Sequence, residues 1–165
     1  MSAKAIVSRA SVPGHNAEIL GRAGIEAPLS NLALEGGALG AAMLVPAQAE
    51  LLIRHANPRF FTTSIHRAIF SAMCTLGPQG LDCTLVAHEM GRQGHEVPWG
   101  VLSHLDDGVV PEIPMATRIE RLEELYRLRR LALLAEQLGE RVHSPGTCAA
   151  EIIRGVRARL EEIAQ

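Results

Sequence analysis

The longest unbroken helical pattern in this 165-residue chain lies in its C-terminal third and constrains its fold most. After Pro111 or Pro114, helix-forming residues continue to about Leu138. Within this stretch a leucine recurs at every third position from Leu122 to Leu134. Each step of three residues falls about 60° short of a full turn, so the leucine stripe winds around the helix. One antiparallel neighbour covers only one side, so the remainder requires either the rest of this chain or another subunit.

A second C-terminal helix is expected to complete a hairpin. The stretch "GERVHSPG" predicts a turn, and a helix follows from about Thr147 to Ile163. Apolar residues in this helix repeat at alternating spacings of four and three, as in a two-heptad seam. A seam at this place favours self-association of the chain, through Ala149, Ile153, Val156, Leu160 and Ile163.

The preceding part of the chain predicts short helices and no strand. Ser30 is the expected cap of a helix ending before Pro46, and a second helix covers Ala47–Ala56. Ser64 and Thr84 are the expected caps of the next two helices, and a fifth begins at Pro98. The predicted fold is all-α, a compact head of about six short helices followed by a long antiparallel helical hairpin. Its predicted divisions are a weakly ordered tail over 1–27, with a short helix around Ala17–Arg22, a head over 28–110 and a hairpin over 111–165.

Composition narrows the class of protein. The length fits one domain, and a net charge of −2 supplies no global basic field for nucleic acid. Three widely spaced cysteines, Cys74, Cys83 and Cys148, argue against a disulfide framework and for a reducing compartment. No apolar run approaches the length of a membrane span, and the N-terminus has no clean apolar stretch with a cleavage site, so we do not expect a signal peptide. We therefore expect a cytoplasmic protein without membrane contact.

Motifs for catalysis are absent from the sequence. No GxxxxGK[ST] loop occurs, and Lys4 is the only lysine. The stretch "HEMGRQGH", from His88 to His95, spaces its histidines too widely for a zinc-protease motif. By helical angle His66 lies at the edge of a buried face, which predicts a ring packed on the core with one nitrogen on a backbone carbonyl. We expect no catalytic, cofactor-binding or metal-binding residue.

Arginines in the long helix leave an alternative open. The helix alternates arginines with glutamates, which is typical of a solvated helix face: Arg118, Arg121, Arg127, Arg129 and Arg130 with Glu120, Glu123 and Glu124. Three of them within four residues, Arg127, Arg129 and Arg130, would also suit an acidic partner or the backbone of DNA. A helical DNA-binding regulator is therefore the alternative function.

From Pro28 to the C-terminus the sequence resembles the N-terminal domain of DnaB-type replicative DNA helicases. Four segments carry the likeness in order. Glu35, Leu39, Gly40, Ala41 and Leu44 match in "LEGGALGAAML", and Pro58, Phe61, His66, Arg67, Ile69 and Phe70 match in "PRFFTTSIHRAIFSAM". Gly80, Leu81, Asp82, Val86 and Glu89 match in "GLDCTLVAHEM", followed by Val110, Pro111, Ile119, Glu120 and Leu128–Leu131. Leu32 and Leu34 depart from the pattern by occupying acidic positions.

The resemblance implies a non-catalytic assembly domain of a hexameric helicase. Such domains pair through their hairpins into dimers, three of which form a collar, and the collar docks the primase's helicase-binding domain or influences a helicase loader. ATP and Mg would belong only to a helicase domain that this sequence does not contain, and direct DNA contact is not expected. The expected docking site is the junction of head and hairpin, at Leu102, Leu122, Arg127, Leu128 and Arg130.

Overall fold

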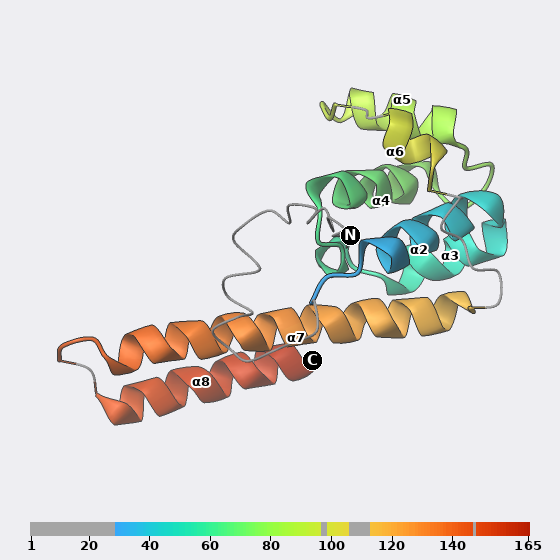
Figure 1. Ribbon diagram of the computed structural model, residues 1–165. Coiled ribbons are helices and arrows are strands. Elements are labelled where there is room, and N and C mark those ends of the chain that lie inside the picture. The colour runs from blue at the N-terminus through green and yellow to red at the C-terminus, as the bar shows by residue number, and fades with distance from the viewer. Residues whose placement is uncertain (1–28, 97–98, 106–112, 147) are drawn as a thin grey trace, which may run out of the picture. The chain divides into compact units, whose positions relative to one another are not determined.

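The computed structural model describes residues 29–96, 99–105, 113–146 and 148–165, which form helices and no strand. The all-α prediction is confirmed (Figure 1). The predicted tail and its short helix lie outside the described residues. None of the described helices is both long and apolar enough to cross a membrane. In chain order the helices are α2 (Leu32–Leu44), α3 (Pro46–His55), the 3-10 helix η1 (Pro58–Phe60), α4 (Ser64–Leu76), α5 (Cys83–Arg92), α6 (Trp99–Ser103), α7 (Met115–Val142) and α8 (Ala149–Ala164).

The described chain divides into two compact units inside α7. The first, which we call the head, is Leu29–Arg130, and the second, the hairpin unit, contains Leu131–Gln165. The head extends beyond the predicted limit at residue 110, because Met115, Ile119 and Leu122 from α7 belong to its buried core.

Helix starts in the head are fixed by side-chain caps that differ from those predicted. Asn31 caps α2, and its Oδ1 accepts a hydrogen bond of 2.9 Å from the N–H of Leu34. Thr63 caps α4 and Asp82 caps α5 in the same way. The predicted caps Ser30, Ser64 and Thr84 were wrong by one or two positions, because each neighbours another residue type that also caps well.

Helix α4 supplies the centre of the head's core. Ile69 and Met73 are fully buried, and the ring of Phe70 lies 5.1 Å from that of Phe61. The tilted geometry of these two rings is favourable for aromatic side chains. Phe60, the third phenylalanine, packs against Tyr126 of α7 with ring centroids 5.5 Å apart and tilted planes. The aromatic side chains thus join α4 and the first half of α7 to η1 and the residue that follows it.

The leucine stripe of α7 leaves the core as the helix proceeds. Leu122 is 1% exposed and Leu125 is buried, Leu128 is half-buried, and Leu131 is 39% exposed. This progression is what a three-residue repeat on a 3.6-residue helix produces.

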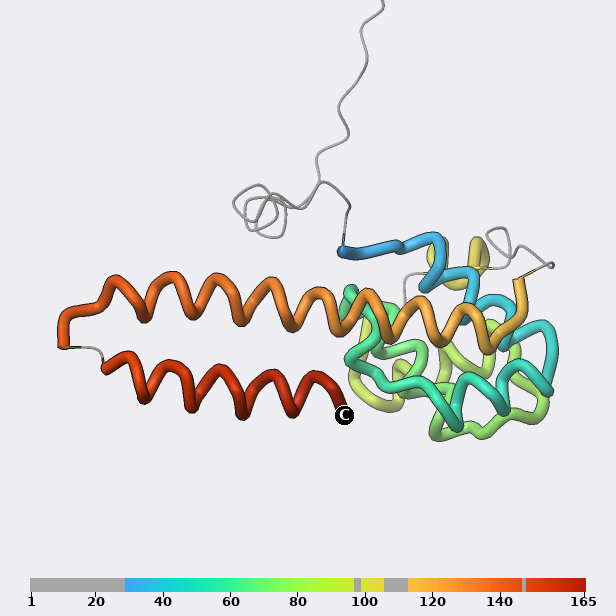
Figure 2. Tube along the Cα trace, turned by 90° about the horizontal axis from the view of Figure 1, so that it is seen from below, coloured from blue at the N-terminus to red at the C-terminus, as the bar shows by residue number. Residues whose placement is uncertain are grey.

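In the hairpin unit α8 runs antiparallel to the second half of α7 (Figure 2). Gly155 of α8 faces the guanidinium of Arg141 on α7, where an added Cβ would lie 3.7 Å from Nη1. The least exposed positions of α8 are Ile152, Gly155, Val156 and Ile163. They share one side of the helix, since residues three, four and seven apart face the same direction.

Candidate functional site: a pocket beside a buried Glu35–His66 pair

A buried carboxylate organises the interior of the head. Glu35 in the first turn of α2 is inaccessible to solvent. Its two oxygens accept hydrogen bonds of 3.0 Å from the N–H of Thr62, and Oε1 accepts a further bond of 2.5 Å from the Thr62 hydroxyl. Oε2 lies 2.7 Å from Nδ1 of His66 on α4. We call Glu35, Thr62, His66 and Arg129 the Glu35 cluster.

Arg129 closes the cluster from α7. Its Nη1 donates to the carbonyl of Leu29 at 2.8 Å and to the hydroxyl of Thr62 at 3.3 Å. Its Nη2 donates to the carbonyl of Phe60 at 2.6 Å. The planar guanidinium therefore ties the chain entering α2 to the segment before α4, as a fork of five donors allows.

The cluster shifts the pKa of Glu35 and that of Arg129. Burial alone would raise the pKa of Glu35, but hydrogen bonds from His66 and Thr62, and the charge of His66, outweigh it and lower that pKa. Burial lowers the pKa of Arg129, while the nearby charge of Glu35 opposes that change. The carboxylate is thus held ionised inside the head.

The partner of His66 was predicted incorrectly. The ring is buried as expected, but its nitrogen pairs with the Glu35 carboxylate rather than with a backbone carbonyl. The helical angle alone located the buried edge of α4, yet it could not identify a side chain 31 positions earlier in the chain. An ionised carboxylate only accepts hydrogen bonds, so Nδ1 of His66 carries a proton and donates it to Glu35.

His66 also lines a pocket between α2, α4 and α6. The pocket has a volume of about 460 Å³. Its walls are mainly apolar, from Leu32, Ile65, Val101 and Leu105, and two glycines of α2, Gly36 and Gly37, leave space along one side. His104 and Thr63 contribute polar groups to its edge, although the Thr63 hydroxyl already accepts the N–H of His66.

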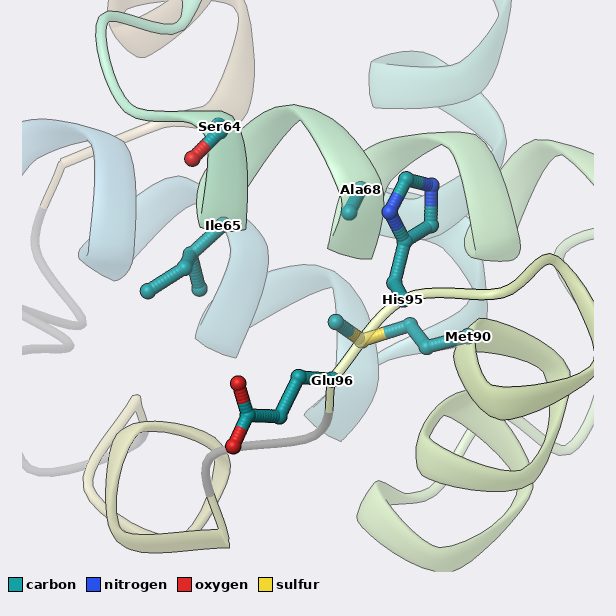
Figure 3. A pocket seen from close by; sticks show the side chains of 6 residues that line it. All are labelled: Ser64, Ile65, Ala68, Met90, His95 and Glu96. Atoms are coloured by element: carbon teal, nitrogen blue, oxygen red, sulfur yellow. The ribbon is translucent and has the colours of Figure 1, made fainter.

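A neighbouring pocket lies on the other side of Ile65. It has a volume of about 420 Å³ and opens between α4 and α5. Figure 3 shows the His95 ring beside Ala68 and the Glu96 carboxylate on the far side of Met90. The two pockets share Ile65, so the beginning of α4 borders both.

Among the residues that the structure describes, no group of three or more His, Cys, Asp or Glu side chains could hold a metal ion. Within "HEMGRQGH", Glu89 is instead bonded to Arg92 and Gln93.

Comparison with known proteins gave a match in structure alone. No family model matches the chain, and no curated protein matches it in sequence. Among solved structures, the N-terminal domain of DnaB helicase from Mycobacterium tuberculosis superposes with a TM-score of 0.71. The match covers 82% of this chain and 99% of that domain, at 22% sequence identity. The fold is that of a DnaB N-terminal domain. The resemblance read from the sequence is thereby confirmed for the fold.

On this DnaB-type fold the predicted docking residues divide into two groups. Leu102 and Leu122 are fully buried in the head's core, so their predicted place on a contact surface was wrong. Their apolar side chains serve packing. Arg127, Leu128 and Arg130 are partly exposed on α7 and remain predictions as docking residues.

The predicted self-association seam of α8 also divides. Val156 and Ile163 belong to the less exposed side of the helix, whereas Ile153 and Leu160 are exposed. Ala149, Ile153 and Leu160 fall within about 40° of one another around the helix. The apolar strip of α8 that is left open for a contact with another chain therefore consists of these three residues.

The hairpin arginines considered for DNA are engaged within the chain. Arg127 pairs with Glu123 at 2.6 Å, and Arg130 bonds to the hydroxyl of Tyr126 at 3.2 Å. Arg129 belongs to the Glu35 cluster. These contacts give the DNA-binding alternative no support. Arg129 is the residue that sequence reasoning placed least well, since its partners lie about 70 to 100 positions away.

Proposed function

We propose that this chain is a non-catalytic assembly and partner-binding domain of a replicative DNA helicase. It associates with copies of itself through the hairpin unit, as dimers that assemble in threes, and it docks a primase or a helicase loader. The DnaB-type fold supports the class of protein. The exposed apolar surface of the hairpin unit supports the mode of assembly.

That surface is the observation on which the proposal depends. In the hairpin unit the exposed large apolar side chains are Leu131, Leu133, Val142, Ile153 and Leu160. On α7, Leu131 and Val142 lie within about 20° of each other around the helix. On α8, Ile153 and Leu160 are equally close. Exposed apolar surface of this extent on a small unit is typical of a protein–protein contact. A second copy offering the same strips would bury them.

Sedimentation equilibrium at micromolar concentration tests the assembly. We expect the unmodified chain to sediment as a dimer or larger, and Leu160→Glu to shift it to monomer, because a buried unpaired carboxylate opposes association. Arg154→Glu adds the same group on another side of α8 and should leave the dimer intact. A monomer in every case would contradict the proposal.

Docking of a second protein is assigned to the exposed part of α7 at the end of the head. Arg127, Leu128 and Arg130 combine charge with an aliphatic surface, a mixture typical of partner contacts. Titration with the helicase-binding domain of a primase should show binding that Arg127→Glu weakens. Equal binding by both forms would remove this site from the proposal.

The proposed role requires no reaction by this chain and no cofactor. ATP and Mg would act in a separate helicase domain, and the whole assembly would work in the cytoplasm.

A further inference from the structure

Two arginine side chains meet at the hydroxyl of Tyr126, where η1 packs against α7. Nη1 of Arg130 donates a hydrogen bond of 3.2 Å to this hydroxyl, and the guanidinium carbon lies 5.9 Å from the centre of the tyrosine ring. Burial raises the pKa of Tyr126, but the hydrogen bond from Arg130, together with one from Arg59, outweighs it and lowers that pKa. We call Arg59, Tyr126 and Arg130 the Tyr126 site.

Contacts of η1 with α7 hold this site in place. Phe60, the residue after Arg59, packs its ring against Tyr126 with the centroids 5.5 Å apart. Nη2 of Arg129 donates to the carbonyl of Phe60 at 2.6 Å and to that of Arg59 at 3.5 Å. The side chains of Arg59 and Arg130 are therefore brought together before any ligand arrives, which reduces the entropy lost on binding.

Two exposed arginines give this face of the head positive charge that no described carboxylate balances. Arg59 of η1 and Arg67 of α4 are exposed, and neither has an ion pair within the described part of the chain. Burial is the main cause of the lowered pKa of Arg129, and the charge of Arg67 adds to it. The guanidinium groups thus repel one another here, and a bound anion would relieve that repulsion.

The Tyr126 site offers hydrogen-bond donors and no free acceptor. The phenol oxygen accepts hydrogen bonds from the arginines, while its own hydrogen has no acceptor among the residues that the structure describes. Each guanidinium also carries more N–H donors than one hydroxyl can accept. Such a set of donors matches the oxygens of an anion.

Glutamates in the preceding turns of α7 restrict the kind of anion. Glu123, one turn before Tyr126, pairs with Arg127 at 2.6 Å, and Glu120 and Glu124 are exposed. A continuous polyanion such as DNA, laid along this helix, would be repelled by these carboxylates. A single carboxylate would contact only the arginines.

We propose that the Tyr126 site binds the carboxylate of a glutamate or aspartate side chain, presented by an acidic segment of a partner protein. The planar guanidinium recognises a carboxylate through two parallel hydrogen bonds, and arginine and tyrosine are frequent anchors at protein interfaces. This inference rests on the proposed partner-binding role, and it names the chemistry of the partner at that surface.

Two peptides that differ only in charge test the site. One alternates glutamate with alanine and is blocked at both ends, and its control carries glutamine in place of each glutamate. We expect the glutamate peptide to shift the NMR signals of the Arg59 and Arg130 Nε–H groups saturably at about 0.15 M salt, where distant charges are screened. It should bind at least about tenfold more tightly than the control, as for a charge-assisted hydrogen bond. Equal binding, or shifts that map elsewhere, would overturn the site.

Substitutions separate a defined site from general attraction of charge. Arg59→Gln should weaken binding of the glutamate peptide about tenfold. Arg121→Gln removes the same charge about 140° around α7 from Tyr126 and should leave binding unchanged. Tyr126→Phe keeps the ring against Phe60 but loses the hydroxyl, so we expect binding about threefold weaker. If Arg59→Gln and Arg121→Gln weakened binding equally, the site would be contradicted.

Three comparisons separate this inference from the alternatives and from the proposed function. Sedimentation of Arg59→Gln should match that of the unmodified chain, and a monomer would reassign the arginines to a contact between copies. A single-stranded oligonucleotide should not displace the glutamate peptide, and displacement would overturn the choice of a protein ligand. If a primase domain binds through Arg127 but neither peptide binds, the Tyr126 site is wrong and the proposed function stands. If the glutamate peptide binds and the primase domain does not, the site stands and the primase is not its partner.

Discussion

Nδ1 of His66 lies 2.7 Å from Oε2 of Glu35, and this pair joins α4 to α2 inside the head. The contact fixes the orientation of the imidazole ring and holds a carboxylate charge away from water. This one interaction therefore contributes both to the geometry of the interior and to the stability of the head.

Removing the charge of Glu35 should destabilise the head. Glu35→Gln keeps the shape of the side chain but replaces an acceptor oxygen with a donor amide, which opposes the donors of Thr62 and His66. We expect a loss of about 2 kcal/mol in the free energy of unfolding, measured by urea denaturation. Glu50→Gln, at an exposed pair with Arg54, should change it by less than about 0.5 kcal/mol. Equal effects would contradict the cluster's role.

Acid should destabilise the head through the same carboxylate. The folded-state pKa of Glu35 is lowered from its ordinary value of 4.5, so the unfolded chain takes up a proton first. The stabilisation is present above about pH 4.5 and is lost as the pH falls through the lowered folded-state pKa. Urea denaturation between about pH 6 and 3 should show this decline. Hydrogen bonds from Arg92 and Gln93 also lower the pKa of Glu89, so Glu89 contributes to the same loss of stability in acid. The contribution of Glu35 is the part of the pH dependence of the free energy of unfolding that disappears in Glu35→Gln.

Arg129 should not tolerate replacement by lysine. An ammonium group cannot reproduce the two-sided contact of Nη1 and Nη2 with the carbonyls of Leu29 and Phe60. We expect Arg129→Lys to lower the free energy of unfolding by about 2 kcal/mol and to speed amide exchange at Thr62. Arg127→Lys, which retains a surface pair with Glu123, serves as the control. Unchanged exchange at Thr62 would show that the fork is dispensable.

Leucines near the start of α7 should contribute more to the free energy of unfolding than leucines farther along the helix. Leu122→Ala leaves a cavity in the core and should lower the free energy of unfolding by about 3 kcal/mol. Leu131→Ala truncates an exposed side chain and should lower that of the isolated chain by less than about 1 kcal/mol. Thermal unfolding at low protein concentration compares them. A similar loss in both would mean that Leu131 is covered.

Two glycines should respond oppositely to alanine. Gly36 lies within α2 with room for a methyl group, so Gly36→Ala should stabilise the head by about 1 kcal/mol. Gly77 ends α4 with a φ of +80°, so Gly77→Ala should destabilise it by about 1 kcal/mol. If both variants moved the melting temperature in the same direction, the different roles assigned to Gly36 and Gly77 would be contradicted.

Local sequence patterns were enough to predict the helices, whereas the residues of the Glu35 cluster are brought together by contacts between positions far apart in the sequence. Proline, glycine and capping residues bounded α2 to α5, and the three-residue spacing predicted how the stripe of α7 winds. The same reasoning missed Arg129, because its charged neighbours along the helix are typical of a solvated face and its partners are backbone carbonyls far away in sequence. It also placed Leu102 and Leu122 on a surface, since apolar residues at a junction suit packing and docking equally well.

Arg129 has a consequence for how the protein is synthesised. Its guanidinium bonds to the carbonyl of Leu29, one hundred residues earlier, so the head cannot complete its interior until Arg129 has left the ribosome. Until the middle of α7 emerges, the carbonyls of Leu29 and Phe60 lack their guanidinium partner. Nascent chains that stall before Arg129 should therefore expose the apolar segment around Phe60, the part of the head that a chaperone would first encounter.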